Sequence, residues 1–283
     1  MSNLDIKCKF CNSILHKKKY VINYKNFSNT HGIFYDCEKC NLEINFNKFE
    51  DLYENQESTN YNFSKNIFYY LKKIILISFL LKFKKILNNR EKILDYGCGS
   101  GEFSSALSYV FPKSKIFACD IFEIKNDFLL KITKFFNLQK SNFGDYKFDA
   151  IILRHVFEHF LNPQEFISDI KNNLTDDGVL MIEVPNKNSI WKKIMKMRWP
   201  GYFYPYHYYV FSELFLKNYF DKQGFKLIKI KKLEPPIFGS FFLTFGLNRS
   251  LSRFLSLLIY PIQFVLSKLF FTSESFLIVI CKK

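Results

Sequence analysis

The sequence predicts an α/β protein built on a doubly wound parallel sheet, with a small cysteine-rich segment before it and an apolar helical insertion near its end. Three observations lead to this fold class. Strands and helices alternate from residue 92 onward, a glycine turn follows the first strand, and two Cys-x-x-Cys pairs precede both. With 283 residues, 48% of them hydrophobic, the chain has enough apolar material for a large domain and a small appendage.

The alternation of apolar strands with helices defines the central sheet. Because alternating elements favour parallel strands with helices on both faces, we expect a doubly wound arrangement. Pro163 marks the first turn of one helix, and Asp177-Gly178 supplies the turn into the fifth strand. The predicted strands are 92–96, 115–120, 148–153, 179–184, 225–231 and 276–281, with a poorly marked one near 136–138, and the predicted helices are 102–110, 124–135, 163–174 and 212–224.

The glycine turn after the first strand predicts a nucleoside-cofactor site. Gly97, Gly99 and Gly101 occupy alternate positions, and without a Cβ atom they let a bulky cofactor approach the backbone and the helix start beyond it. Asp120 closes the next apolar run, where a carboxylate can accept hydrogen bonds from both hydroxyls of a ribose. The glycines alone are also compatible with a tight turn that binds nothing, so the paired acid is the stronger part of the signal.

Further motifs follow in a recognisable order. They are Phe148-Asp149-Ala150-Ile151-Ile152, then Glu158-His159, then the run 177–186, DGVLMIEVPN. With these motifs, residues 90–232 resemble class I methyltransferases that use S-adenosylmethionine, in the branch that contains the ubiquinone-pathway O-methyltransferases. The resemblance implies a Rossmann-like fold in which Asp120 holds the ribose, the glycine turn receives the amino-acid end, and Asp95 orders that turn or the cofactor amine. The cofactor-binding residues that it implies are Asp95, Gly97, Gly99, Gly101, Asp120, Leu153 and Arg154.

Histidines are the candidate catalytic bases. If the methyl acceptor is a hydroxyl group, its proton must pass to a base, and histidine is the usual choice. His207 lies in an aromatic loop after the fifth strand and is the first candidate, followed by His155 and His159. His159 has a second reading, in which Glu158-His159 only holds its loop in place.

The N-terminal cysteines predict a zinc ribbon over residues 1–46. Two residues between the members of each pair let a tight turn aim both sulfurs at one ion, and four thiolates suit tetrahedral Zn²⁺. Such a closed site is structural and supplies folding energy to a segment with little core. Four unligated thiols, or His16 or His31 in place of one thiolate, are the alternatives. The predicted ligands are Cys8, Cys11, Cys37 and Cys40. A similar ribbon precedes the catalytic domain of related methyltransferases that modify sugars, and the resemblance implies that it helps to bind the substrate.

The remaining segments complete the predicted organisation. Residues 47–88 form a linker and a packing helix over 67–87, and residues 89–283 form the methyltransferase domain. Within it, residues 234–275 are an insertion of two apolar runs, the second interrupted by Pro261, each too short to span a membrane. We weigh two roles equally for this insertion: contact with a membrane interface through 237–271, or an apolar cap over the substrate pocket or a dimer face.

We therefore expect an S-adenosylmethionine-dependent methyltransferase that acts on a small molecule, by O-methylation of a sugar, glycan or lipid-linked intermediate. One alternative is an inactive methyltransferase-like scaffold or membrane-surface binding protein. Another is an NAD-dependent oxidoreductase, which would favour G-x-G-x-x-G, whereas Glu102 and Phe103 follow Gly101 here. The acceptor, the choice among O-, C- and N-methylation, the base and the oligomeric state stay open.

Charge and the N-terminus bear on partners and location. The formal net charge is +15, but the lysines are spread along the chain, so we expect no nucleic-acid partner. The opening residues lack an apolar signal region, which predicts a cytoplasmic protein. Contact through the insertion would place it at the inner face of the membrane.

Overall fold

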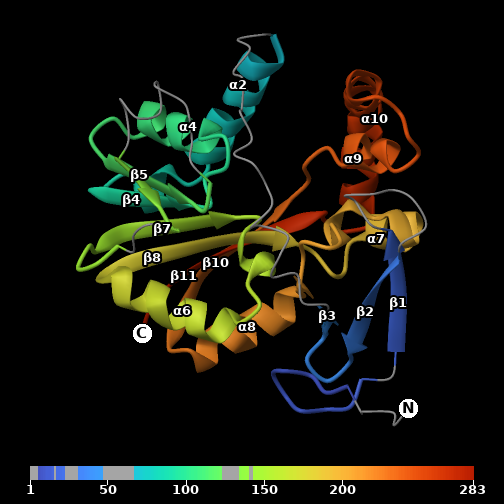
Figure 1. The fold of residues 1–283 in the computed structure, drawn as a ribbon. Helices are drawn as coiled ribbons and strands as arrows, with labels where there is room; N and C mark the ends of the chain where they lie inside the picture. The colour runs from blue at the N-terminus through green and yellow to red at the C-terminus, as the bar shows by residue number, and fades with distance from the viewer. Residues whose placement is uncertain (1–5, 16, 23–30, 47–66, 123–133, 140–142) are drawn as a thin grey trace. The chain divides into compact units, whose positions relative to one another are not determined.

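The computed structural model describes residues 6–15, 17–22, 31–46, 67–122, 134–139 and 143–283 (Figure 1). Its strands form one sheet in the order β1-β2-β3-β9 and a seven-stranded sheet in the order β10-β11-β8-β7-β4-β5-β6. The chain divides into two compact units. Unit 1 comprises Met1–Tyr53, Phe157–Leu161 and Glu183–Ile278, and unit 2 comprises Glu54–Val156, Asn162–Ile182 and Val279–Lys283.

Unit 2 contains the parallel strands that the sequence predicted. Strand β4 pairs in parallel with β5 on one side and with β7 on the other, and β5 pairs in parallel with β6. Ile93, Leu94 and the run Ile151-Ile152-Leu153 are fully buried, as expected for strands covered on both faces. The elements are α2 (Ile67–Leu81), α3 (Lys84–Leu87), β4 (Lys92–Tyr96), α4 (Glu102–Val110), β5 (Lys115–Asp120), β6 (Lys134–Asn137), β7 (Phe148–Arg154), α6 (Pro163–Asn173) and β8 (Leu174–Pro185).

Two predictions for this region need correction or lie outside the described residues. Most of the predicted helix 124–135 is outside them, and its last two residues belong instead to β6. The turn predicted at Asp177-Gly178 is wrong, because β8 runs from Leu174 to Pro185 without a break. A Cβ atom at Gly178 would lie 2.8 Å from the Thr175 carbonyl oxygen, so a close approach of backbone, not a turn, requires glycine there.

Unit 1 begins with an antiparallel sheet. Strands β1 (Lys17–Ile22), β2 (His31–Cys37) and β3 (Leu42–Asn45) pair in sequence order, and the short strand β9 (Tyr209–Val210) pairs with β3. Phe34, Trp199 and Val210 meet in one buried cluster, so the N-terminal sheet shares its core with a segment some 170 residues further along the chain. We call β1, β2, β3 and the two cysteine turns the ribbon.

The rest of unit 1 follows β8. Its elements are η1 (Phe157–His159), α7 (Ile190–Met195), η2 (Lys196–Arg198), η3 (Pro200–Tyr202), α8 (Glu213–Lys222), β10 (Phe225–Leu233), α9 (Phe238–Leu243), α10 (Arg249–Leu269) and β11 (Ser275–Lys282). Ser212 caps α8 by accepting the Phe215 N–H, and Asn248 caps α10 by accepting the Leu251 N–H.

The interruption predicted at Pro261 is also wrong. Helix α10 continues past this residue and comprises 21 residues, Arg249 to Leu269. We expected both apolar runs of the insertion to be too short to span a membrane, and for the second run, which forms α10, this expectation is wrong. Within the described residues, α10 alone is long and apolar enough to cross a membrane when length and composition are the only criteria.

Candidate functional site

The glycine turn has the backbone that the sequence predicted. Gly97, Gly99 and Gly101 have φ values of +70°, +53° and +75°, a region that residues with a Cβ atom rarely adopt. A Cβ at Gly97 would lie 2.5 Å from a methyl group of Val156, whereas one at Gly99 would meet nothing within 4 Å. Gly97 is therefore required for packing, and Gly99 borders open space.

Asp120 lies at the end of β5 and holds this turn. Its Oδ2 atom accepts the N–H of Gly99 at 2.8 Å, and Oδ1 accepts the N–H of Phe122 at 3.1 Å. A carboxylate has about four lone-pair positions, so each oxygen retains acceptor capacity after these bonds. Positive-φ glycines, open space at Gly99 and an adjacent carboxylate fit an adenosyl cofactor with two ribose hydroxyls.

Asp95 ties β4 to the helix after the turn. The Ser104 hydroxyl on α4 donates to Asp95 Oδ2, which supports the ordering role that the resemblance implies. Burial raises the pKa of Asp95 to about 6, although the Ser104 hydrogen bond and the charge of Arg154 act in the opposite direction. The Arg154 guanidinium lies over the rings of Phe79 and Phe103, 5.0 and 4.6 Å from their centroids. The Leu153 side chain is fully buried in β7 and serves packing.

The structure brings two of the three candidate histidines together. The rings of His159 and His207 lie 4.6 Å apart, and His207 Nε2 lies 3.8 Å from Glu158 Oε1. His155, in unit 2, is exposed at the end of β7 with a left-handed φ of +54°. Glu158 was not predicted as a functional residue, although its position in the Glu158-His159 pair was visible.

Hydrogen bonds assign the protons on both rings. His159 Nδ1 lies 3.1 Å from the Tyr206 carbonyl oxygen, and His207 Nδ1 lies 2.9 Å from that of Gly201. A carbonyl oxygen only accepts, so each Nδ1 carries a proton and each neutral ring keeps its basic lone pair on Nε2. For His207 that atom faces a fully buried carboxylate, which stabilises the ring after it takes a proton.

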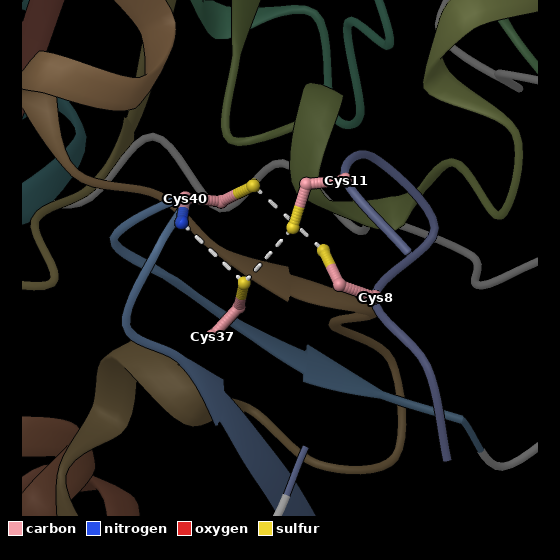
Figure 2. Close-up of side chains that lie close together, drawn as sticks. All are labelled: Cys8, Cys11, Cys37 and Cys40. Carbon is pink, nitrogen blue, oxygen red and sulfur yellow. Dashed lines mark hydrogen bonds between the residues drawn. The ribbon is translucent and has the colours of Figure 1, made fainter. Parts of the chain in front are cut away.

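The four predicted cysteines converge at one end of the ribbon (Figure 2). The Sγ atoms of Cys11 and Cys37 are 3.6 Å apart, those of Cys8 and Cys40 are 3.8 Å apart, and all four lie within 4.8 Å of one another. Tetrahedral zinc with Zn–S bonds of about 2.3 Å places sulfurs about 3.8 Å apart, so the geometry fits this ion. Although burial opposes it, hydrogen bonding to Ser13 lowers the pKa of Cys11 to about 6.

A buried charge cluster in unit 1 was not predicted. Glu43, fully buried in β3, pairs with Lys19 and with Lys192, whose Nζ lies 2.7 Å from Oε1. Burial lowers the pKa of Lys192 to about 8, although the charge of Glu43 opposes this shift. Nearby, Lys187 pairs with Asp36 at 2.8 Å. The cluster borders a cavity of about 450 Å³, which is lined by Lys19, Tyr20, Lys192, Lys193, Lys196, Met197 and Tyr202.

Comparison with known proteins establishes the family. Residues 64–230, more than half of the chain, match the family described as methyltransferase domain. The chain therefore belongs to this family, and its domain is that of a class I S-adenosylmethionine-dependent methyltransferase.

Individual relatives are more distant. A carboxy-S-adenosyl-L-methionine synthase from Campylobacter hominis is 27% identical over 133 residues, which cover 42% of this chain and 54% of that protein. The chain thus matches about half the length of this curated relative. A SAM dependent methyltransferase from Archaeoglobus fulgidus is 19% identical, with a TM-score of 0.48, and the match covers 77% of this chain and 100% of the other. The 1,6-didemethyltoxoflavin-N1-methyltransferase of Burkholderia thailandensis is 12% identical, with a TM-score of 0.49 and coverage of 76% and 80%.

Proposed function

We propose that this protein transfers a methyl group from S-adenosylmethionine to a hydroxyl of a small molecule, either a sugar, a glycan or a lipid-linked intermediate, as a member of the ubiquinone-type O-methyltransferase branch. The observation that supports the cofactor is the turn in which Asp120 accepts the Gly99 N–H beside open space. The relative from Campylobacter hominis is named for a carboxylated form of the same cofactor, which is consistent with this assignment.

Methyl transfer places two requirements on the protein. The cofactor supplies an electrophilic methyl group on a sulfonium, so the chain must align the acceptor oxygen with that carbon and exclude water. Asp120 and the glycine turn orient the cofactor, while Asp95 and Ser104 keep the turn in register with α4.

His207 is the proposed base. Its Nε2 lone pair accepts the hydroxyl proton, its Nδ1–H stays on the Gly201 carbonyl, and the Glu158 carboxylate stabilises the imidazolium. A positioned base of this kind contributes about 10²- to 10⁴-fold to a rate. His159 packs edge-on against the ring of His207, and His155 is the remaining candidate.

We also propose that the cysteine cluster holds one structural Zn²⁺. Four closely spaced sulfurs leave no coordination position for a substrate, so the ion would stabilise the ribbon without entering the reaction.

Calorimetric titration of the zinc-replete protein with S-adenosylhomocysteine tests the cofactor assignment. The Asp120→Ala variant removes two charge-assisted acceptors for ribose and should weaken binding by about 100-fold or more. Asp149→Ala is the matched control, because Asp149 also accepts a backbone N–H, that of Lys92 at 2.9 Å, but lies near the start of β7 instead of at the end of a strand.

The outcomes separate the alternatives. Binding that survives in Asp149→Ala and fails in Asp120→Ala supports the proposal and justifies screening acceptors with His207→Gln as the base variant. A folded wild type that binds neither S-adenosylmethionine nor its product would favour the inactive scaffold. Binding of NADH instead would favour the oxidoreductase.

A further inference from the structure

Helix α10, which forms a hairpin with α9, buries polar side chains and exposes most of its apolar ones. The most buried side chains of α10 are polar, since Ser252, Ser256, Gln263 and Ser267 are at most 5% exposed, and beside them the half-buried Leu266 packs against the apolar cluster of unit 1. The opposite side is apolar and open, with exposures between 47 and 66%. Six of its residues are Phe254, Leu257, Leu258, Ile262, Val265 and Leu269. A helix of a soluble domain normally buries its apolar stripe, so this surface calls for an apolar partner.

Hydrogen bonds hold α10 in this orientation. The Gln263 amide donates to Glu234 Oε1 and, at 2.7 Å, to the Pro235 carbonyl, while its oxygen accepts the Ile237 N–H. The Trp191 indole N–H donates to Ser267 Oγ at 3.0 Å. Rotation of the helix to bury its apolar side would break these bonds and bury unsatisfied polar groups. The exposed apolar side is therefore built into the fold of unit 1.

The charge of the hairpin selects the kind of partner. Residues 235–273 contain no aspartate or glutamate, and the cations among them, Arg249, Arg253 and Lys268, are exposed. The neighbouring α7–η2 segment carries three of the four lysines that line the 450 Å³ cavity, namely Lys192, Lys193 and Lys196. It is joined to the hairpin by Arg198, which donates to the Thr244 carbonyl at 2.6 Å and lies over the Phe245 ring. An apolar face bordered by cations fits a surface that is apolar inside and anionic outside.

A second copy of this chain fits the face less well, because an isologous contact would bring the same cations against each other. Crossing of the membrane is also disfavoured. It would place Gln263 and Ser267 in hydrocarbon, whereas both side chains are hydrogen-bonded to other segments of unit 1. Both ends of α10 are attached to unit 1, through α9 and β11.

We propose that the α9–α10 hairpin lies in the interfacial layer of an anionic membrane, with its apolar side among the acyl chains and Arg249, Arg253 and Lys268 against lipid phosphates. This inference is independent of the proposed methyl transfer, since it uses neither the glycine turn nor the histidines. For a cytoplasmic protein, this contact of the hairpin would be with the inner face of the membrane.

Vesicle flotation of the full zinc-replete chain tests the proposal. The probes are vesicles of phosphatidylcholine alone and vesicles with a quarter of phosphatidylglycerol. We expect the wild type to float with the anionic vesicles, and Leu258→Gln/Ile262→Gln to lower its partition coefficient at least about tenfold. Arg249→Gln/Arg253→Gln should lower binding to anionic vesicles about tenfold while leaving the weaker binding to phosphatidylcholine unchanged. Leu214→Gln is the matched control, because Leu214 on α8 is 56% exposed against 59% for Leu258.

Three outcomes would overturn the proposal. The first is a wild type that floats with neither vesicle, and the second is a Leu258→Gln/Ile262→Gln variant that binds as well as Leu214→Gln. The third is a lipid-free dimer in light scattering that this double variant dissociates, without vesicle binding by the wild type. That result would assign the face to a second copy of the chain.

Discussion

Two glycines with the same backbone provide a controlled test of the cofactor site. Gly99 and Gly144 both have a φ of +53°, and a Cβ atom at either would meet nothing within 4 Å. Replacing either by alanine forces a Cβ into the left-handed region, which costs about 1 kcal/mol of folding free energy. The two variants should therefore lose similar stability in urea unfolding. Only the Gly99 methyl group would occupy the space assigned to the cofactor.

The two variants should consequently differ in binding, not in stability. For Gly99→Ala we expect the affinity for S-adenosylhomocysteine to fall at least about tenfold, equivalent to about 1.4 kcal/mol, because a methyl group displaces the ligand from the turn. Gly144→Ala should bind as the wild type does. Titration calorimetry measures both, and equal affinities for the two variants would refute the assignment of the open space at Gly99.

Three further predictions concern charge and metal. The pKa of Asp95 is about 6 in the folded protein, against 3.8 when unfolded, so the folded state binds the proton more tightly. The free energy of unfolding of the wild type relative to Asp95→Asn should therefore rise by up to about 3 kcal/mol as the pH falls from 7 to 4. Urea titrations at several pH values measure this difference. Glu43→Gln should lower the free energy of unfolding by about 3 kcal/mol, because it leaves Lys19 and Lys192 beside a buried neutral group. The double variant Glu43→Gln/Lys192→Met should be more stable to urea than Glu43→Gln, because it also removes one of these two charges. Elemental analysis should find one zinc per chain, and chelation should lower the melting temperature.

Each of these predictions has a control. If the difference in free energy of unfolding between wild type and Asp95→Asn stayed constant across this pH range, folding would not raise the pKa of Asp95. If Glu43→Gln were as stable as the wild type, the ion cluster would contribute nothing to the fold. Cys11→Ser should lose the metal and Cys281→Ser, with a half-buried sulfur outside the cluster, should keep it. Equal zinc content in these two variants would contradict the metal site.

Local patterns explain which features the sequence could predict. Strands β4, β5 and β7 are continuous apolar runs bounded by polar residues, and each cysteine turn depends on a spacing of three residues. Gly178 and Pro261 were misread because the same residue types mark turns and breaks, whereas here one permits close backbone approach and the other continues a helix. Only the surrounding structure decides between these uses.

Long-range contacts account for what the sequence could not predict. Glu43 and Lys192 are separated by 149 residues, and neither position carries a local signal of burial or pairing. His207 was predicted as a base, but its carboxylate partner came from η1, almost 50 residues earlier. In α10 the apolar residues were evident, whereas the side of the helix that unit 1 covers depended on bonds to Gln263 and Ser267.

The pairing of β3 with β9 makes the ribbon part of the framework around the proposed base. The Asn45 N–H donates to the Tyr208 carbonyl at 2.8 Å, and its amide donates to the carbonyl of His207 itself. A chain trimmed to start after residue 46 would lose these bonds and expose the edge of β9, which invites aggregation. Expression of the methyltransferase domain for crystallisation or engineering should therefore retain the first 46 residues.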